Sequence, residues 1–351
     1  MRTLAYAALS ASTRLQPLAI DRRALRADDV AIEILYCGVC HSDLHQARND
    51  WGSARYPMVP GHEIIGRVQA VGSAVTSVNV GDAVGVGCMA DSCRDCDQCN
   101  QGEEQFCRHG VTMTYNGRDR ISGDITQGGY SRAIVVRDAF VIALSPQLDL
   151  ARAAPLLCAG ITSWSPLRQY GAGPGTRLGV IGLGGLGHMA VKLGAALGCE
   201  VTLITGSAGK AADARALGAQ HVLVPGDAEA MRAAASSLDL IIDTVPVAHA
   251  LAPYVKLLDV GGRIVLVGAL EEMPPLDASL LVRGRKQVSG SLIGGIAQTR
   301  ELLEFCAQKG IYPECEQIPM QDINEAFARM ERSDVKYRFV IDMASLDAQG
   351  A

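Results

Sequence analysis

The residue pattern with the clearest chemistry is a group of four cysteines within fifteen residues: Cys93, Cys96, Cys99 and Cys107. Thiolates separated by two residues can surround one metal ion, and four of them complete a tetrahedral Zn2+ site with no open position. Two disulfides or an iron–sulfur cluster would use the same residues, and the spacing alone leaves the cluster open. Because the surrounding stretch is too polar to order itself around a core, we expect residues 93–107 to fold as a structural zinc lobe.

A second group of potential ligands lies upstream, in residues 37–45 (CGVCHSDLH) and 61–63 (GHE). A lone Cys-x-x-Cys pair is only moderately specific for metal or redox chemistry, and a single histidine is more often packed in a core. Here thiols, imidazoles, a hydroxyl and two carboxylates occur close together, and they can supply an open zinc site with supporting hydrogen bonds. The residues concerned are Cys37, Cys40, His41, Ser42, Asp43, His45, His62 and Glu63.

Residues 176–205 have the pattern of a strand, a glycine turn, a helix and a second strand. The apolar run at 176–181 is followed at once by Gly182, Gly184 and Gly187. Glycines at this spacing let the backbone turn tightly and approach a pyrophosphate at the helix N-terminus. Further apolar runs begin at 221, 238, 263 and 287, with helical stretches at 207–217 and 247–258. We therefore expect a doubly wound parallel sheet between about residues 151 and 291.

The end of the second strand indicates which nicotinamide dinucleotide binds. An acidic residue there binds the 2′-hydroxyl of the adenine ribose in NAD(H). This chain has instead Thr205, Gly206, Ser207 and, three residues later, Lys210. Small hydroxyls and a cation suit a 2′-phosphate, so the sequence favours NADP(H). Lys210 can also be an ordinary solvated helix residue, and no arginine stands at position 206.

Composition and charge narrow the class of protein. A chain of 351 residues with 48% hydrophobic residues predicts about two domains with a sizeable core. Lys and Arg total 32 against 37 Asp and Glu, so a formal charge of −5 gives no basic field for nucleic acid or an anionic membrane. The best candidate for a membrane span, residues 178–191, is too short and too rich in glycine. Because the cysteines suit metal binding in a reducing compartment, we expect a cytoplasmic protein.

Seven stretches of the chain resemble the zinc-dependent medium-chain alcohol dehydrogenases, and specifically the cinnamyl alcohol dehydrogenase-like branch. They are CGVCHSDLH at 37–45, YPMVPGHEIIG at 56–66, the four-cysteine lobe at 93–107, TQGGYS at 126–131, CAGITSWSPL at 158–167, GLGGLGH at 182–188 and KYRFVIDM at 336–343. The resemblance implies an α/β protein with a GroES-like, β-rich catalytic domain at about 1–150 and a Rossmann cofactor domain at 151–291. Residues 292–351 would return to the first domain, and the cleft between the domains would hold cofactor and zinc.

The resemblance also implies two zinc ions per subunit. Cys40, His62 and Cys158 would bind the catalytic ion, leaving a fourth position for water or a substrate oxygen. Asp43 would support the ligand histidine, and Glu63 would lie beside the ion. Ser42 would meet the substrate oxygen and His45 would form the outer end of a proton path, whereas Cys37 becomes a packed thiol. The structural zinc would be bound by Cys93, Cys96, Cys99 and Cys107.

Cofactor and substrate contacts follow from the same resemblance. Thr162 would lie against the nicotinamide, Arg338 against the pyrophosphate and His41 near the phosphates. The other expected cofactor contacts are Gly182, Gly184, Gly185, Leu186, Gly187, Thr205, Ser207, Lys210, Thr244 and Val267. In the substrate pocket, Trp51 aligns near the wall, and Thr112 stands where plant members have a bulky aromatic residue. That departure, in a chain with five Phe and two Trp, favours a broad range of aldehydes over strict cinnamyl specificity.

The implied activity is reversible hydride transfer between NADP(H) and a primary alcohol or aldehyde, with reduction favoured. A polyol or sugar dehydrogenase of the same superfamily is an alternative, and Cys158 argues against it because such enzymes often have glutamate at the third ligand. A non-catalytic zinc module for nucleic acid or protein partners is a second alternative. Its lobe would be acidic, which opposes nucleic acid. Relatives of this branch are commonly homodimers joined through the Rossmann sheets, here through residues 284–295.

Overall fold

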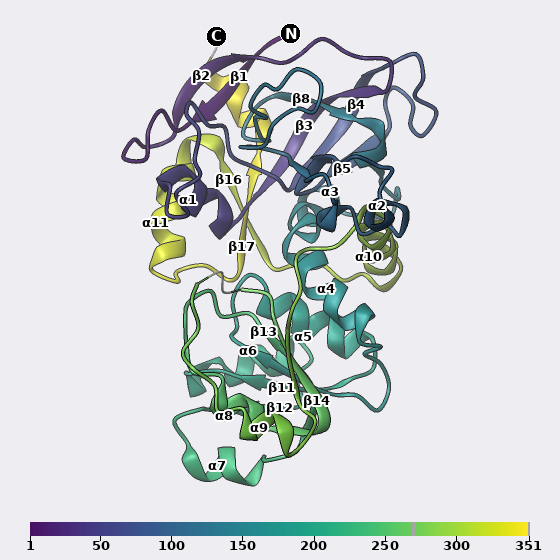
Figure 1. Ribbon diagram of the computed structural model, residues 1–351. Helices are drawn as coiled ribbons and strands as arrows, with labels where there is room; N and C mark the ends of the chain where they lie inside the picture. The colour runs from purple at the N-terminus through teal and green to yellow at the C-terminus, as the bar shows by residue number, and fades with distance from the viewer. Residues whose placement is uncertain (269–270, 350–351) are drawn as a thin grey trace. The chain divides into compact units, whose positions relative to one another are not determined.

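The chain divides into two compact units in a computed structural model that describes residues 1–268 and 271–349. Unit 1 comprises Met1–Cys158 and Gly294–Ala351, and unit 2 comprises Ala159–Ile293. Figure 1 shows both units as ribbons, with the strands and helices labelled. Among the described residues, no helix is long and apolar enough to cross a membrane.

Unit 1 is built on a mostly antiparallel sheet in which the strand order is β16-β17-β3-β4-β5-β9, with β8 also paired to β3. Small sheets β1-β2 and β6-β7 accompany it. The strands are β1 (Arg2–Ala7), β2 (Gln16–Asp21), β3 (Asp29–Val39), β4 (Ile64–Val71), β5 (Ala83–Val86), β6 (Met89–Asp91), β7 (Thr112–Met113), β8 (Ala133–Arg137), β9 (Ile142–Ala143), β16 (Cys315–Pro319) and β17 (Arg338–Asp342). The helices are α1 (His41–Arg48), α2 (Asp97–Asn100), α3 (Leu150–Ala153), α10 (Ile296–Lys309) and α11 (Ile323–Glu331).

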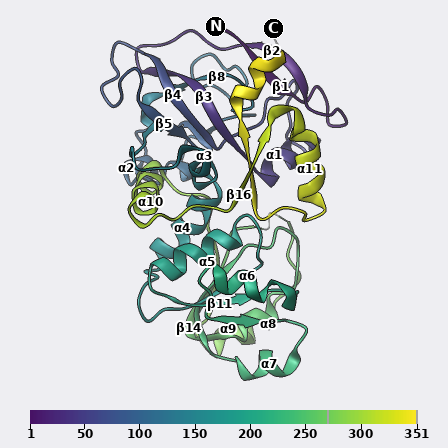
Figure 2. The same ribbon diagram turned by 180° about the vertical axis from the view of Figure 1, so that it is seen from behind.

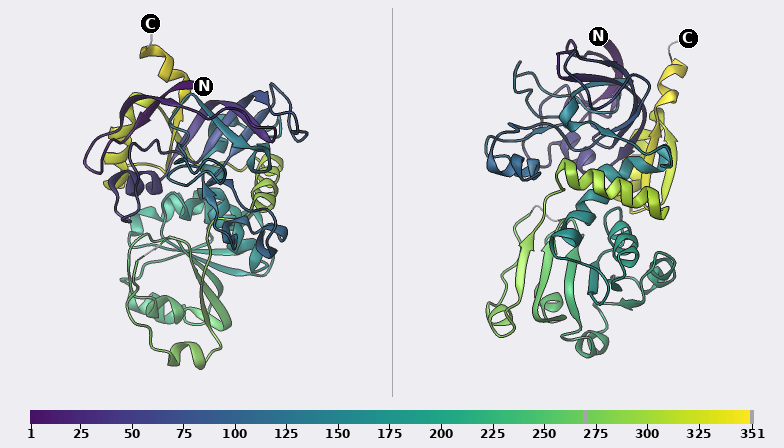
Figure 3. Two further views of the ribbon diagram at one scale, coloured as in Figure 1. Left: turned by 45° about the horizontal axis from the view of Figure 1, so that its top comes forward. Right: turned by 90° about the vertical axis from the view of Figure 1, so that its right-hand side faces the viewer.

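The C-terminal segment of the chain completes this sheet. Strand β17 pairs antiparallel with β3, with Phe339 opposite Val39, and β16 pairs parallel with β17. Figure 2 shows the yellow β16 and β17 together with α11, and Figure 3 shows α10 and the same strands from two further directions. Residues separated by some three hundred positions therefore lie side by side in one sheet.

Unit 2 contains a six-stranded sheet in the order β12-β11-β10-β13-β14-β15, and every pair in it is parallel. The order reverses direction between β10 and β13, which makes that position the switch point of a doubly wound sheet. The strands are β10 (Arg177–Ile181), β11 (Glu200–Ile204), β12 (His221–Leu223), β13 (Leu238–Asp243), β14 (Leu258–Leu266) and β15 (Gln287–Gly290). The helices are α4 (Ala159–Gln169), α5 (Gly187–Ala196), α6 (Ala211–Ala216), α7 (Ala228–Ala233), α8 (Ala252–Val255) and α9 (Ser279–Val282).

The apolar runs of unit 2 become buried strands because helices cover a parallel sheet on both faces. Ile181, Ile204, Leu238 and Ile264 lie in one core cluster at 2% exposure or less. The expected fold class is confirmed, but the helix expected at 247–258 is wrong in extent. Only α8 forms there, because Leu258 pairs with Leu238 and so already belongs to β14.

Candidate active site and metal centres

Three potential metal ligands from distant parts of the sequence meet in unit 1. Cys40 follows β3, His62 precedes β4, and Cys158 ends a short turn after α3. One ligand atom from each of these residues and from Glu63 lies within 4.8 Å of all the others, and all four residues are buried. The site brings together the three ligands expected for the catalytic zinc.

The donor set and its spacing fit a zinc ion. The Sγ atoms of Cys40 and Cys158 are 3.9 Å apart, and both cysteines are free. A disulfide would require about 2.05 Å, whereas two thiolates on a tetrahedral zinc, each about 2.3 Å from the ion, lie about 3.8 Å apart. The Cys158 thiol lowers the pKa of Cys40 well below its usual range, and burial opposes this effect. This direction favours the thiolate form of Cys40, which is the form that binds a metal.

The side chain of Asp43 orients the histidine ligand. Its Oδ1 accepts from His62 Nδ1 at 3.0 Å and from the Gly61 N–H at 3.0 Å. Its Oδ2 accepts from the Cys40 N–H and from the Tyr130 hydroxyl, each at 3.0 Å. Because Nδ1 of His62 carries the donated proton, Nε2 is the nitrogen available to a metal.

Glu63 and Arg338 form a buried pair beside these ligands. The guanidinium of Arg338, the first residue of β17, donates to Oε1 of Glu63. Oε2 of Glu63 has no hydrogen-bond partner among the described residues. Burial raises the pKa of Glu63 to about 7, while Arg338 opposes the shift. Gly38 makes room for this carboxylate, because a Cβ there would lie 1.9 Å from Oε2. Arg338, expected at the pyrophosphate, thus contacts Glu63 in unit 1, and its cofactor role stays a prediction.

Helix α1 carries the residues expected to move a proton. His45 Nδ1 lies 2.8 Å from Asp50 Oδ2, and the Trp51 ring lies 5.6 Å from the His45 ring between centroids. Ser42 lies near the start of the same helix, and its carbonyl accepts from the Tyr115 hydroxyl. Asp50 was not among the residues expected at this site from the sequence. The only local signal was a carboxylate five residues after a histidine, beyond the end of the helix.

The two residues expected in the substrate pocket lie in different surroundings. Trp51 packs against His45 and is 41% exposed. Thr112 is buried on β7, and its hydroxyl donates to the Arg118 carbonyl at 2.9 Å. Strand β7 pairs with β6, which leads into the cysteine lobe. The structure therefore gives Thr112 a hydrogen bond within its own loop, and its role in a pocket stays a prediction.

The four-cysteine lobe forms a second closed group of thiols. The ligand atoms of Cys93, Cys96, Cys99 and Cys107 lie within 4.8 Å of one another, and the Sγ atoms of Cys93 and Cys99 are 3.8 Å apart. Backbone N–H groups approach three of the sulfurs at 3.3–3.4 Å, and Oγ of Ser92 lies 3.2 Å from Sγ of Cys99. This cage has the spacing and the supporting donors of a structural zinc site.

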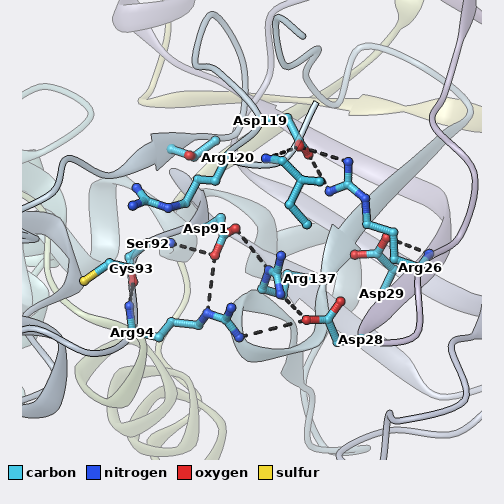
Figure 4. A network of polar contacts seen from close by, with 12 residues as sticks. Arg26, Asp28, Asp29, Asp91, Ser92, Cys93, Arg94, Asp119, Arg120 and Arg137 are labelled. Carbon is cyan, nitrogen blue, oxygen red and sulfur yellow. Dashed lines mark hydrogen bonds and ion pairs between the residues drawn. The ribbon is translucent and has the colours of Figure 1, made fainter. Parts of the chain in front are cut away.

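An ion-pair network joins this lobe to the sheet of unit 1, as Figure 4 shows. Arg137, at the end of β8, donates from Nε to Asp91 at 3.0 Å and from Nη1 to Asp28. Arg94 Nε lies 3.6 Å from Asp91, and the Ser92 N–H donates to Asp91 at 2.8 Å. Because Asp91 and Arg137 are buried, the network fixes where the lobe begins.

The expected cofactor residues of unit 2 gather at the carboxyl ends of its strands. The Gly182–Gly187 turn follows β10, and the Thr244 hydroxyl after β13 donates to the Ile181 carbonyl at 2.7 Å. Lys210 Nζ donates to the Leu183 carbonyl at 3.3 Å, so it lies beside the glycine turn. Thr205 follows β11, Ser207 lies two residues later, and Val267 follows β14. The turn residues Gly185 and Leu186 complete the group, and the Leu186 carbonyl accepts from Ser163, next to Thr162 on α4.

The glycine turn depends on close approach of the backbone. Gly182 has φ +90°, and a Cβ at Gly187 would lie 2.1 Å from the Gly182 carbonyl oxygen. One close contact at the same edge was not expected from the sequence. His249 Nε2 lies 3.0 Å from Asp243 Oδ2, at the end of β13. The arrangement matches the phosphate-binding edge of a doubly wound sheet.

Family models match both units. Residues 26–146 match the alcohol dehydrogenase GroES-like domain, and residues 185–308 match the zinc-binding dehydrogenase model. The NADP-dependent alcohol dehydrogenase C of Mycobacterium tuberculosis is 49% identical over 97% of this chain and 99% of its own. The aldehyde reductase YahK of Escherichia coli is 48% identical over 99% of each chain.

Solved structures agree with these relatives. A cinnamyl alcohol dehydrogenase from Sorghum bicolor superposes with a TM-score of 0.95 at 44% identity, over 98% of each chain. The cinnamyl alcohol dehydrogenase of Helicobacter pylori, solved with NADP(H), has a TM-score of 0.92 at 40% identity and covers 98% of this chain and 99% of its own. With both domain models, both metal-ligand groups and full-length relatives in accord, the chain belongs to the zinc-binding alcohol dehydrogenase family.

Proposed function

We propose that this protein is a zinc-dependent alcohol dehydrogenase that transfers a hydride between NADP(H) and primary alcohols or aldehydes, and that it works mainly as a broad-range aldehyde reductase. The observation that carries the proposal is the buried set Cys40, His62 and Cys158, with Asp43 orienting the histidine and an imidazole–carboxylate pair on the adjoining helix. Relatives at 48–49% identity are named as an NADP-dependent alcohol dehydrogenase and an aldehyde reductase.

Cys40, His62 and Cys158 would hold the catalytic zinc, which as a Lewis acid polarises the carbonyl of the substrate. Cys40 contributes a thiolate, and Asp43 keeps Nε2 of His62 aimed at the metal position. Glu63 is buried, and one of its carboxylate oxygens accepts a hydrogen bond from Arg338. The guanidinium therefore balances the negative charge of the carboxylate. A buried site of this kind excludes bulk water, which protects a hydride donor from side reactions.

His45 would exchange the proton that accompanies hydride transfer. Asp50 accepts from Nδ1 of His45 and so fixes the tautomer, leaving Nε2 to give or take a proton. The His45 side chain is 36% exposed, which lets it exchange that proton with solvent. Ser42, three residues earlier on α1, would pass the proton between the substrate oxygen and His45.

Unit 2 would bind NADP(H), the hydride donor, at the edge where β10 and β13 end. Residues 182–187 offer backbone N–H groups to the pyrophosphate. Lys210, held against Leu183, and Ser207 would meet the 2′-phosphate, because no carboxylate follows β11. Thr162, Thr205, Thr244 and Val267 would line the rest of the site, while His41 and Arg338 would contact the phosphates.

Substrate range, assembly and compartment complete the proposal. Trp51 would form part of the pocket wall, and a threonine at position 112 in place of a bulky residue would admit aliphatic as well as aromatic aldehydes. Residues 284–295, which include the outer strand β15 and the exposed Leu292, would form the interface of a homodimer. The free cysteines fit the reducing cytoplasm.

The test is the oxidation of NADPH and NADH with a panel of aromatic and aliphatic aldehydes, before and after zinc removal by a chelator. We expect chelator-sensitive turnover with NADPH preferred. Cys40→Ser and His62→Ala should lower kcat/KM by more than about 100-fold, whereas Cys315→Ser, outside both metal-ligand groups, should leave it unchanged. Oxidation of sorbitol in place of aldehyde reduction would instead identify a polyol dehydrogenase, and full activity in Cys40→Ser would contradict the zinc assignment.

A further inference from the structure

The segment TQGGYS at 126–131 lies directly against the residues that lead into His62. The Gly128 N–H donates to the Val59 carbonyl at 2.7 Å, and the Gly129 N–H donates to the Gly61 carbonyl at 2.8 Å. The Tyr130 N–H donates to the Pro60 carbonyl at 3.0 Å. Three consecutive backbone bonds therefore hold the chain on the N-terminal side of a metal ligand.

Small residues make this close approach possible. A Cβ at Gly128 would lie 2.3 Å from the Pro60 oxygen, and one at Gly129 would lie 2.4 Å from the Ile64 side chain. Gly61 has φ +100°, and a Cβ there would lie 2.7 Å from the Tyr130 ring. The backbones of residues 126–131 and of the residues before His62 are thus in direct contact, which leaves the Tyr130 side chain little conformational freedom.

Tyr130 reaches the carboxylate that orients the ligand histidine. The side chain is fully buried, and its hydroxyl donates to Oδ2 of Asp43 at 3.0 Å. Oδ1 of Asp43 accepts from His62 and Gly61, and the other acceptor position on Oδ2 is used by the Cys40 N–H. The tyrosine hydroxyl therefore completes a four-donor cradle that spans both sides of the carboxylate.

A buried arginine holds the same segment. Nη2 of Arg22 donates to the Gly128 carbonyl at 2.7 Å and to the Ser131 hydroxyl at 2.6 Å, while Nη1 donates to the Gln127 carbonyl. Its Nε donates to the Ala133 carbonyl at 2.9 Å. Burial lowers the pKa of Arg22 to about 9, and a nearby arginine adds to the effect. Because the buried Arg22 guanidinium donates its hydrogen bonds to carbonyl oxygens of this segment, it fixes the course of residues 127–133.

We propose that Tyr130 is a positioning residue for the catalytic metal, acting through Asp43 to keep His62 aimed at the ion, and that Arg22 holds the segment that carries Tyr130. The inference rests on the proposed function, because it takes Cys40, His62 and Cys158 as the zinc ligands. Removing the group that hydrogen-bonds a metal-ligating histidine, here Asp43, typically changes metal affinity by about 10- to 100-fold. Tyr130 acts one hydrogen bond further from the ion, so we expect an effect at the lower end of that range.

The test is zinc release from the holoenzyme to the chelator 4-(2-pyridylazo)resorcinol, in which the four-cysteine lobe serves as an internal control. Tyr130→Phe should release the catalytic-site zinc about 10-fold faster and leave the structural-site phase unchanged. Comparison with Cys40→Ser assigns the two phases. The matched control is Tyr6→Phe, which removes another buried tyrosine hydroxyl, while the backbone bond from Tyr6 N–H to the Tyr130 carbonyl remains.

A double-mutant cycle separates positioning from general destabilisation. If Tyr130 acts through Asp43, Tyr130→Phe should add little to the release rate of an Asp43→Asn variant. Arg22→Lys provides a second variant, and it should accelerate the same phase to a smaller extent. Wild-type release in Tyr130→Phe, equal acceleration of both phases, or full additivity with Asp43→Asn would overturn the inference. Wild-type protein that binds only one zinc per chain would instead contradict the proposed function.

Discussion

At the scale of single residues, the cysteines of the metal lobe differ sharply in their surroundings. Backbone N–H groups at Cys99 and Arg108 lower the pKa of Cys96 to about 6. Burial raises the pKa of Cys99 to about 12, although Ser92 opposes the shift. Without metal, the lobe therefore contains a reactive thiolate beside a protonated thiol at neutral pH.

In the zinc-free protein at pH 7, iodoacetamide should modify Cys96 well before Cys99. A lowered pKa means that the Cys96 thiolate is present above about pH 6 and is lost below it, so its alkylation rate should rise through that value. Peptide mass spectrometry of samples quenched at several pH values measures both rates. Cys315, whose pKa burial raises to about 12, is the slow control. A midpoint near the ordinary thiol pKa of about 8.5 would contradict the prediction.

Lys210 provides the residue-level test of cofactor choice. Its ammonium group lies beside the glycine turn, where a 2′-phosphate would reach it. Lys210→Ala should lower kcat/KM for NADPH by roughly 10-fold or more, because a hydrogen bond to a charged group contributes about 1.5–3 kcal/mol. The kcat/KM of the same variant for NADH should hardly change. Lys309→Ala, at the end of α10 in unit 1, is the matched control, and equal losses with both cofactors would assign Lys210 a structural role.

At the scale of elements, two glycines of one turn have separable roles. A methyl group at Gly187 would meet the Gly182 carbonyl oxygen at 2.1 Å, whereas nothing lies within 4 Å of a Cβ at Gly184. Gly187 is needed so that α5 packs against the end of β10. Gly184 leaves open the space into which a pyrophosphate would come.

Gly187→Ala should destabilise the protein by about 1–3 kcal/mol, because the backbone atom that it meets cannot move aside freely. Gly184→Ala should keep the thermal midpoint of the wild type and weaken NADPH binding. Thermal unfolding and titration of NADPH fluorescence measure the two effects independently. Wild-type NADPH affinity in Gly184→Ala would show that the turn does not approach the cofactor.

Local sequence predicts these elements well where strand, turn and helix follow one another without interruption, as at residues 176–205. It fails at α8, where a helical pattern over 247–258 yields only four helical residues. The reason is tertiary: Leu258 is drawn into the parallel sheet opposite Leu238. Apolar residues at a helix-like spacing serve a sheet equally well when a neighbouring strand offers pairing.

At the scale of the whole molecule, the chain leaves unit 1 after Cys158 and returns to it at Gly294. Each unit has its own sheet, and both metal-ligand groups lie in unit 1. The lobe is tied to the sheet of that unit through Asp91 and Arg137. Loss of the structural metal should therefore loosen unit 1 and leave the core of unit 2 in place.

Selective removal of the structural zinc should raise hydrogen exchange in β6, β8 and the lobe, with little change in β10 and β13. The expected cause is the loss of the metal crosslink that holds Ser92 and Arg94 against the ion-pair network. Exchange followed by mass spectrometry, before and after chelation, measures this peptide by peptide. Arg137→Met should give the same exchange pattern with zinc still bound. A uniform rise in exchange across both units after zinc removal would contradict the prediction.

Features whose residues are close along the chain could be predicted from local spacing. Cysteines with two residues between them and glycines in one turn set their own geometry, because a few peptide units fix how far apart the side chains can lie. The remaining contacts depend on how distant segments pack in the fold. Cys40 meets Cys158 across 118 positions, and Glu63 meets Arg338 across 275, because the fold packs together elements that local spacing does not place side by side. Cys158 and Arg338 were expected at the site only because of the family resemblance. The contacts of Asp43 with Tyr130 and of His45 with Asp50 became visible only in the fold.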